Sequence, residues 1–108
     1  MIRREVVLVE LEPGAVSEYR KLYQSVWPEL EEIYRQAGYQ EMSCFLNGTW
    51  VIIYMSYDAE KLAQRREWLN AHEVQQNWQA VMQRFKAKTI ESFEEIYRLS
   101  KIGNLNPV

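Results

Sequence analysis

The spacing of apolar residues predicts that strands and helices alternate along the chain. Residues 4–11 form a short apolar run typical of a strand, which Pro13-Gly14 ends. Over residues 15–37 the apolar positions recur at helical spacing, within an arc of about 140°. Pro28 lies inside this stretch and lacks an amide hydrogen, so we expect the helix to kink or restart at Trp27-Pro28. Gly38 then supplies a C-terminal stop.

A hairpin is expected next. Two apolar strands are predicted at about residues 39–46 and 49–57, and Asn47-Gly48 between them is the dipeptide that most favours a two-residue hairpin turn. With the following threonine, this pair also matches a glycosylation sequon. Because no secretion signal is expected in this chain, the turn is the favoured interpretation.

The remaining sequence predicts two helices and a strand. Asp58 can cap a helix over about 59–69 whose apolar face is weak. Asn70, with a glutamate three residues later, resembles a capping box and is expected to open a helix with a stronger apolar face. Residues 92–99 alternate and predict the last strand, and residues 100–108 predict a tail.

The order β-α-β-β-α-β predicts an α+β, ferredoxin-like domain over residues 1–99, with an antiparallel sheet and helices on one face. If the other face met water, its strands would alternate between apolar and polar residues. The strands at 4–11 and 49–57 are instead apolar on both sides. The helices can cover only one face, so a second copy of the chain is the economical cover for the other, and we expect a homodimer.

Composition narrows the class of protein. A chain of 108 residues has room for one core, and a net charge of −2 with both signs interspersed argues against nucleic acid as a partner. The longest apolar stretch, 50–55, is far shorter than the ~20 residues that span a bilayer. The apolar N-terminus is interrupted by Glu5 and Glu10, and one cysteine excludes an internal disulfide. We therefore expect a cytoplasmic protein without a membrane or nucleic-acid partner.

Several kinds of site are excluded by residue counts. A single histidine, a single cysteine and four glycines supply no zinc-ligand spacing and no phosphate-binding loop, so no metal site is expected. His72 is predicted at the surface near a helix start. Cys44 is predicted to be structural, because no base lies near it in the sequence.

An aromatic stripe is the remaining candidate for chemistry. Tyr19, Tyr23 and Trp27 follow one another at helical spacing, and Trp78 on a later helix should approach the same sheet face. Plain core packing explains such a stripe. Buried tyrosine hydroxyls also need partners, so the same rings can line a pocket with polar tips that suits a sugar. Both interpretations stay open on the residues alone.

Residues 23–30, Tyr-Gln-Ser-Val-Trp-Pro-Glu-Leu, resemble the signature of the L-rhamnose mutarotase family, in which a histidine, two variable residues and a β-branched residue precede Trp-Pro-Glu. The likeness extends over about residues 2–99. Members of that family are dimeric α+β barrels that interconvert the anomers of a 6-deoxy sugar without a cofactor. The resemblance therefore implies this fold, a homodimer, a small sugar substrate and no cofactor.

The resemblance also assigns candidate site residues. The sugar-contacting tyrosine of the family matches Tyr19, and the first of its two tandem tryptophans matches Trp78. The catalytic histidine falls on Tyr23, a second sugar-contacting tyrosine on Met42, and the second tryptophan on Gln79. The expected substrate-binding residues are therefore Tyr19, Trp78, Met42, Gln79 and Trp27, and the expected catalytic residues are Tyr23 and Tyr19.

Tyrosine in place of histidine changes the expected chemistry. Mutarotation needs one group to protonate the ring oxygen and another to remove the anomeric proton. A tyrosine with a pKa near 10 donates a proton more readily than it accepts one. Three carboxylates are therefore candidate partners: Glu18, Glu29 and Glu95. The alternatives are a non-catalytic dimeric barrel that binds a small molecule or protein, and a cofactor-free oxygenase of the same superfamily.

Overall fold

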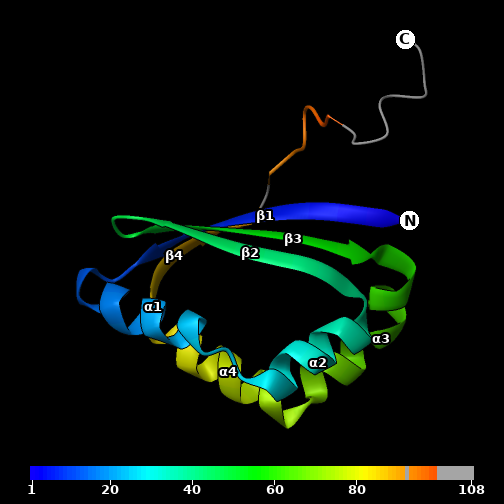
Figure 1. Cartoon of the computed structure of the whole chain (residues 1–108), viewed down its shortest axis with the longest axis horizontal. Helices are drawn as coiled ribbons and strands as arrows, with labels where there is room; N and C mark the ends of the chain where they lie inside the picture. The colour runs from blue at the N-terminus through cyan, green and yellow to red at the C-terminus, as the bar shows by residue number, and fades with distance from the viewer. Residues whose placement is uncertain (92, 100–108) are drawn as a thin grey trace.

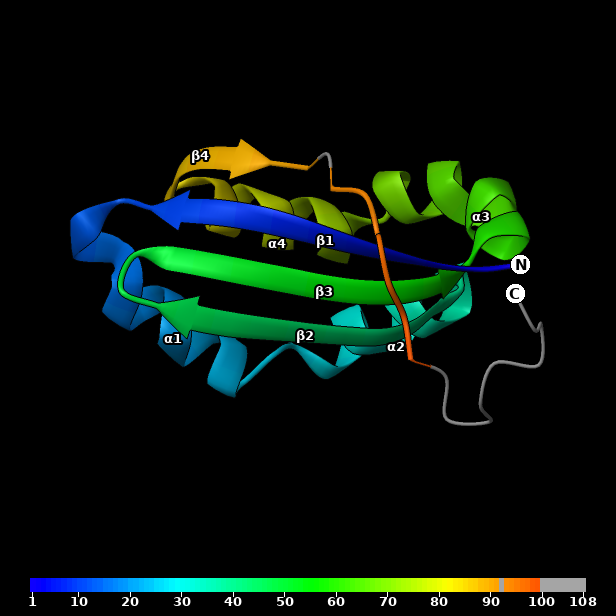
Figure 2. The ribbon, with the colours of Figure 1, turned by 90° about the horizontal axis from the view of Figure 1, so that it is seen from above.

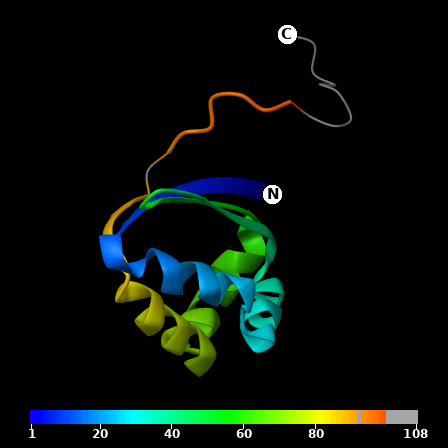
Figure 3. The ribbon, with the colours of Figure 1, turned by 60° about the vertical axis from the view of Figure 1, so that its left-hand side comes forward.

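The computed structural model describes residues 1–91 and 93–99 and contains a four-stranded antiparallel sheet. The strands are β1 (Ile2–Leu11), β2 (Tyr39–Asn47), β3 (Trp50–Asp58) and β4 (Lys86–Ile90), in the order β2-β3-β1-β4. The helices all lie on one face of the sheet, which curves over them (Figures 1 and 3). The ferredoxin-like prediction is confirmed.

The long helical stretch is divided in two, as predicted. After a short 3-10 turn at Pro13–Ala15, α1 spans Val16–Gln24 and α2 spans Pro28–Ala37. Trp27 has an extended backbone, as expected for a residue before proline, and Pro28 opens α2 at a position that needs no amide hydrogen. The break places α1 and α2 at different angles beneath the sheet (Figure 1).

The second pair of helices begins slightly differently from the prediction. Helix α3 (Ala59–Ala71) is capped by Asp58, whose carboxylate accepts a hydrogen bond from the Lys61 amide at 3.0 Å. Helix α4 (Glu73–Gln83) is capped by His72, whose Nδ1 accepts from the Val74 amide at 3.2 Å, so the predicted cap at Asn70 is wrong. In the described residues, none of the helices has the length and hydropathy needed to cross a membrane.

The predicted last strand is wrong in position. Strand β4 forms at Lys86–Ile90, immediately after α4, and pairs with the end of β1. Because only two residues separate α4 from β4, the chain reaches the edge of β1 before the alternating segment begins. Residues 93–99 leave the sheet and pass above it on the face opposite the helices (Figure 2). Residues 92 and 100–108, including the predicted tail, lie outside the described residues.

The core lies between the sheet and the helices. Its fully buried members come from both layers: Val9, Leu11, Val51, Leu30, Leu62 and Met82. The opposite sheet face is apolar but exposed, with Phe45, Trp50 and Ile52 each at least 40% accessible. Across this outer face, Arg4 donates two hydrogen bonds to the Glu95 carboxylate, at 2.7 and 2.8 Å.

Candidate functional site

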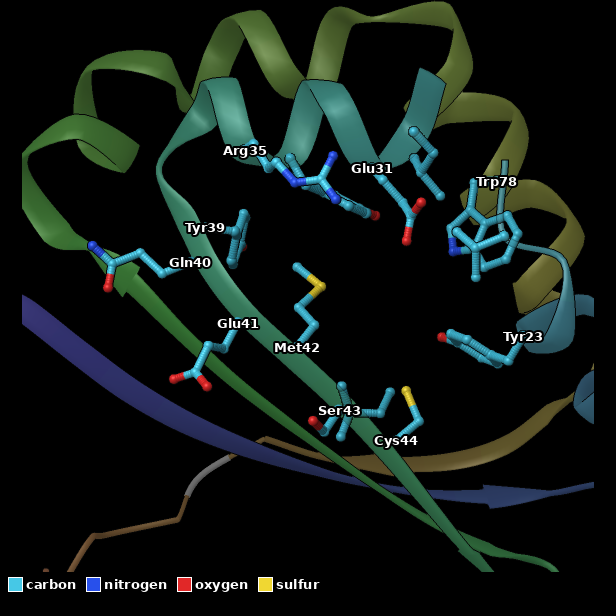
Figure 4. A pocket seen from close by; sticks show the side chains of 14 residues that line it. Tyr23, Glu31, Arg35, Tyr39, Gln40, Glu41, Met42, Ser43, Cys44 and Trp78 are labelled. Atoms are coloured by element: carbon cyan, nitrogen blue, oxygen red, sulfur yellow. The ribbon is translucent and has the colours of Figure 1, made fainter. Parts of the chain in front are cut away.

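A cavity of about 600 Å³ opens between β2 and the helices (Figure 4). Its walls combine aromatic and charged side chains from α1, α2, β2 and α4, among them Tyr23, Glu31, Tyr34, Arg35, Met42, Cys44 and Trp78. A second hollow of about 650 Å³ lies on the outer sheet face beside the hairpin, and its lining holds no titratable side chain. Of these two cavities, only the first is lined by titratable side chains.

Two aromatic rings form one wall of this cavity. The ring of Tyr23 meets the ring of Trp78 edge to face, with centroids 5.6 Å apart and an interplanar angle of 84°. Trp27 also packs edge to face against Trp78, with centroids 5.1 Å apart, and does not itself line the cavity. The buried indole of Trp78 is thus held by two neighbouring rings where it lines the cavity.

Tyr19 lies behind Tyr23, in the core. It is 3% exposed, and its ring centroid is 5.1 Å from that of Tyr23 and 6.3 Å from that of Phe85. Within the described part of the chain its buried hydroxyl has no hydrogen-bond partner, and burial raises its pKa to about 12. Tyr19 is not among the residues that line the cavity.

Tyr23 brings a protonated hydroxyl to the cavity wall. Burial, reinforced by the neighbouring thiol of Cys44 and by Tyr19, raises the pKa of Tyr23 far above its usual value. Burial also raises the pKa of the Cys44 thiol, while the Tyr23 hydroxyl beside it acts in the opposite direction. No local sequence pattern predicts that Cys44 lies beside a tyrosine, because the two residues are on different elements. At neutral pH this pair offers protons and no base.

The other expected residues separate in space. Met42 projects from β2 into the cavity opposite Trp78 (Figure 4), whereas Gln79 is exposed on α4 and does not line it. The Tyr34 hydroxyl donates a 2.6 Å hydrogen bond to Gln75 and also interacts with Gln79. Gln79 therefore contacts Tyr34, which lines the cavity, and does not reach the cavity itself.

Sequence reasoning missed both carboxylates that line the cavity, Glu31 and Glu41. Glu31 lines the cavity, but Glu18 and Glu29 do not, and Glu95 is paired with Arg4 across the outer face. The helical spacing contained the signal, since Glu31 follows Trp27 by one turn and precedes Arg35 by another. No group of three or more potential metal ligands occurs in residues 1–91 and 93–99.

Comparison with known proteins identifies the family of this chain. The sequence model of the family described as L-rhamnose mutarotase matches residues 4–103. The chain belongs to the L-rhamnose mutarotase family. An L-rhamnose mutarotase of Verminephrobacter eiseniae (strain EF01-2) is 31% identical over 70 residues, which make up 65% of this chain and 65% of that relative. The match thus spans less than two thirds of the relative's own length.

Solved structures share the fold. A crystal structure of an L-rhamnose mutarotase from Formosa agariphila matches 89% of this chain and 98% of its own, with a TM-score of 0.71 and 18% identity. An uncharacterized NIPSNAP domain protein from Burkholderia xenovorans matches 93% of this chain and 100% of its own, with a TM-score of 0.64 and 18% identity. This member of the rhamnose mutarotase family therefore has a fold that occurs beyond the family.

Proposed function

We propose that this protein interconverts the anomers of a 6-deoxyhexose or related aldose in the cavity beside Tyr23, without a cofactor. The observation that supports the proposal most directly is that Tyr23, Met42 and Trp78 line one cavity, although they come from α1, β2 and α4. These are three of the positions that match catalytic or sugar-contacting residues of the family. A cavity that combines aromatic rings with polar and charged side chains suits a small polar ligand such as a sugar.

The chemistry assigned to Tyr23 is proton donation. Opening the sugar ring breaks the bond between the anomeric carbon and the ring oxygen, and that oxygen must receive a proton. Burial keeps the Tyr23 hydroxyl protonated. Trp78 offers its ring to the C–H face of the sugar, which positions the ring oxygen within the cavity.

Exchange spectroscopy by NMR tests this function. We expect the protein to accelerate anomer exchange of at least one sugar in a panel of L-rhamnose, L-fucose and common hexoses above the rate in buffer. Acceleration of none of them, by protein shown to be folded, contradicts the proposal.

A binding protein without catalysis is the second candidate. The observation that favours it concerns the single histidine, His72, which caps α4 and does not line the cavity. No histidine is therefore present at the cavity to take the role of the family's catalytic histidine. This alternative predicts saturable chemical-shift changes in the presence of a sugar while the anomer-exchange rate stays at the buffer value.

A further inference from the structure

We propose that Glu31 is the base that removes the proton from the anomeric hydroxyl, an inference that rests on the proposed mutarotase function. In Figure 4 its carboxylate points from α2 into the cavity, and the Tyr23 hydroxyl points into the same space from α1. Trp78 lies beside both groups. A sugar against Trp78 thus meets a proton donor from one helix and a carboxylate from the other.

The fold positions Glu31 through its neighbours. Leu30 and Ile33 are buried in the core and fix the rotation of α2 about its axis. At about 100° per residue, that rotation turns Glu31 toward the side of the helix that faces β2. The break at Pro28 lets α1 and α2 approach the cavity separately. In one continuous helix, Tyr23 and Glu31 would be held about 80° apart around a single axis, at about 100° per residue.

Glu31 differs from the other carboxylates nearby. Within residues 1–91 and 93–99 it forms no hydrogen bond or salt bridge, whereas Glu32 accepts from Gln36 at 3.2 Å and lies 3.8 Å from Arg35. Glu41, the other carboxylate in the cavity lining, accepts a hydrogen bond from the Ser56 hydroxyl at 3.4 Å. Of the two carboxylates that line the cavity, Glu31 is therefore the one without a partner among the described residues.

The proposed step balances in atoms and electrons. The Glu31 carboxylate takes the proton of the anomeric hydroxyl, and the released electron pair forms the carbonyl as the bond from the anomeric carbon to the ring oxygen breaks. Tyr23 gives its proton to that oxygen. Once the aldehyde has rotated about its bond to the next carbon, both protons move in reverse, the ring closes on the other face, and both groups regain their initial states.

Substitution of Glu31 tests the assignment against a matched control on the same helix. Anomer exchange is measured for the wild type, Glu31→Gln and Glu32→Gln, on the sugar that the wild type exchanges fastest. Glu31→Gln removes the negative charge and keeps the size, so we expect kcat to fall about 100-fold or more, with KM changed less than about threefold. Glu32→Gln, outside the cavity, should retain the wild-type rate. Circular dichroism verifies that both variants are folded.

Rescue separates a chemical role from a structural one. In Glu31→Ala, added formate can occupy the vacated space as a base, and we expect it to restore part of the lost rate; Glu32→Ala should neither lose rate nor respond to formate. Loss without rescue, or an unchanged rate in Glu31→Gln, overturns the role of Glu31 while the mutarotase function stands. A wild type that exchanges no sugar overturns both proposals.

Discussion

One helical turn separates Tyr19 from Tyr23, and that turn moves a phenol hydroxyl from the core to the cavity wall. Tyr23→Phe removes the hydroxyl at the wall and keeps the ring that packs on Trp78. We expect the anomer-exchange rate to fall about 100-fold or more, the usual scale for one acid–base group, while the fold is retained. Exchange NMR at substrate saturation measures the change.

The matched control is a tyrosine outside the cavity. The hydroxyl of Tyr57, on β3, donates to the Glu5 carboxylate and does not line the cavity. Tyr57→Phe should therefore keep the wild-type rate and lose about 1 kcal/mol of unfolding free energy. If Tyr23→Phe also keeps the wild-type rate, the proton donor is another group.

The pKa of Tyr23 determines how the reaction depends on pH. A hydroxyl whose pKa is raised above 10 stays protonated throughout the range below pH 10, so Tyr23 contributes no loss of rate there. Tyr23→His replaces it with a group that titrates near about pH 6.5. We expect this variant to show a new change of rate between about pH 6 and 7.5 that the wild type lacks, measured as the exchange rate against pH. Identical profiles would show that residue 23 handles no proton.

At the residue scale, the sequence predicted the aromatic residues of the cavity, Tyr23 and Trp78, but not the carboxylate of Glu31. Helical spacing put Tyr19 and Tyr23 on the same stripe, but it could not say which of them the sheet leaves uncovered, because that depends on the path of β2. Glu18, Glu29 and Glu95 were the candidate carboxylates, and none of them lines the cavity. The break at Pro28 gives α2 its own direction, and this brings Glu31 to the cavity.

At the scale of elements, Gly38 is the residue that connects α2 to β2. It ends α2 with φ of +115°, and an added Cβ would lie 3.3 Å from the backbone of both Asp58 and Leu62. Because the neighbouring atoms are backbone, they cannot move aside cheaply. We expect Gly38→Ala to lower the unfolding free energy by about 1–3 kcal/mol, measured by urea denaturation.

Gly14 provides the control for this substitution. It lies in the turn after β1, and an added Cβ there would meet nothing within 4 Å. Gly14→Ala should change the unfolding free energy by less than about 1 kcal/mol. If Gly38→Ala and Gly14→Ala lower the unfolding free energy equally, the close backbone contacts at Gly38 do not explain the loss.

Element order was more predictable from sequence than element boundaries. Strong local signals, such as Pro28 and Asn47-Gly48, gave the helix break and the hairpin. The last strand was misplaced because residues 92–99 alternate more clearly than Lys86–Ile90. Pairing with β1 depends on the short connection after α4, and this connection determines the strand even though Lys86 and Lys88 weaken the local pattern.

At the scale of the whole molecule, the outer sheet face carries a continuous apolar row. Phe45, Ile52, Leu8 and Ile90 are neighbours in register across all four strands. Phe45 is 61% exposed, and Ile96 on the segment above the sheet is 90% exposed. Soluble monomers rarely expose a connected patch of this kind. A second copy of the chain, docked on this face, would cover the row from β2 to β4.

A homodimer through the outer face is therefore the prediction at this scale. Analytical ultracentrifugation at micromolar concentration should show a species of twice 13.0 kDa. Ile52→Lys places a charge at the centre of the row and should shift the protein toward monomer, because an unpaired charge is costly to bury. Gln64→Lys adds the same charge on exposed α3 and should leave the dimer intact. A wild type that sediments only at 13.0 kDa contradicts the dimer, and an Ile52→Lys variant that stays dimeric places the interface elsewhere.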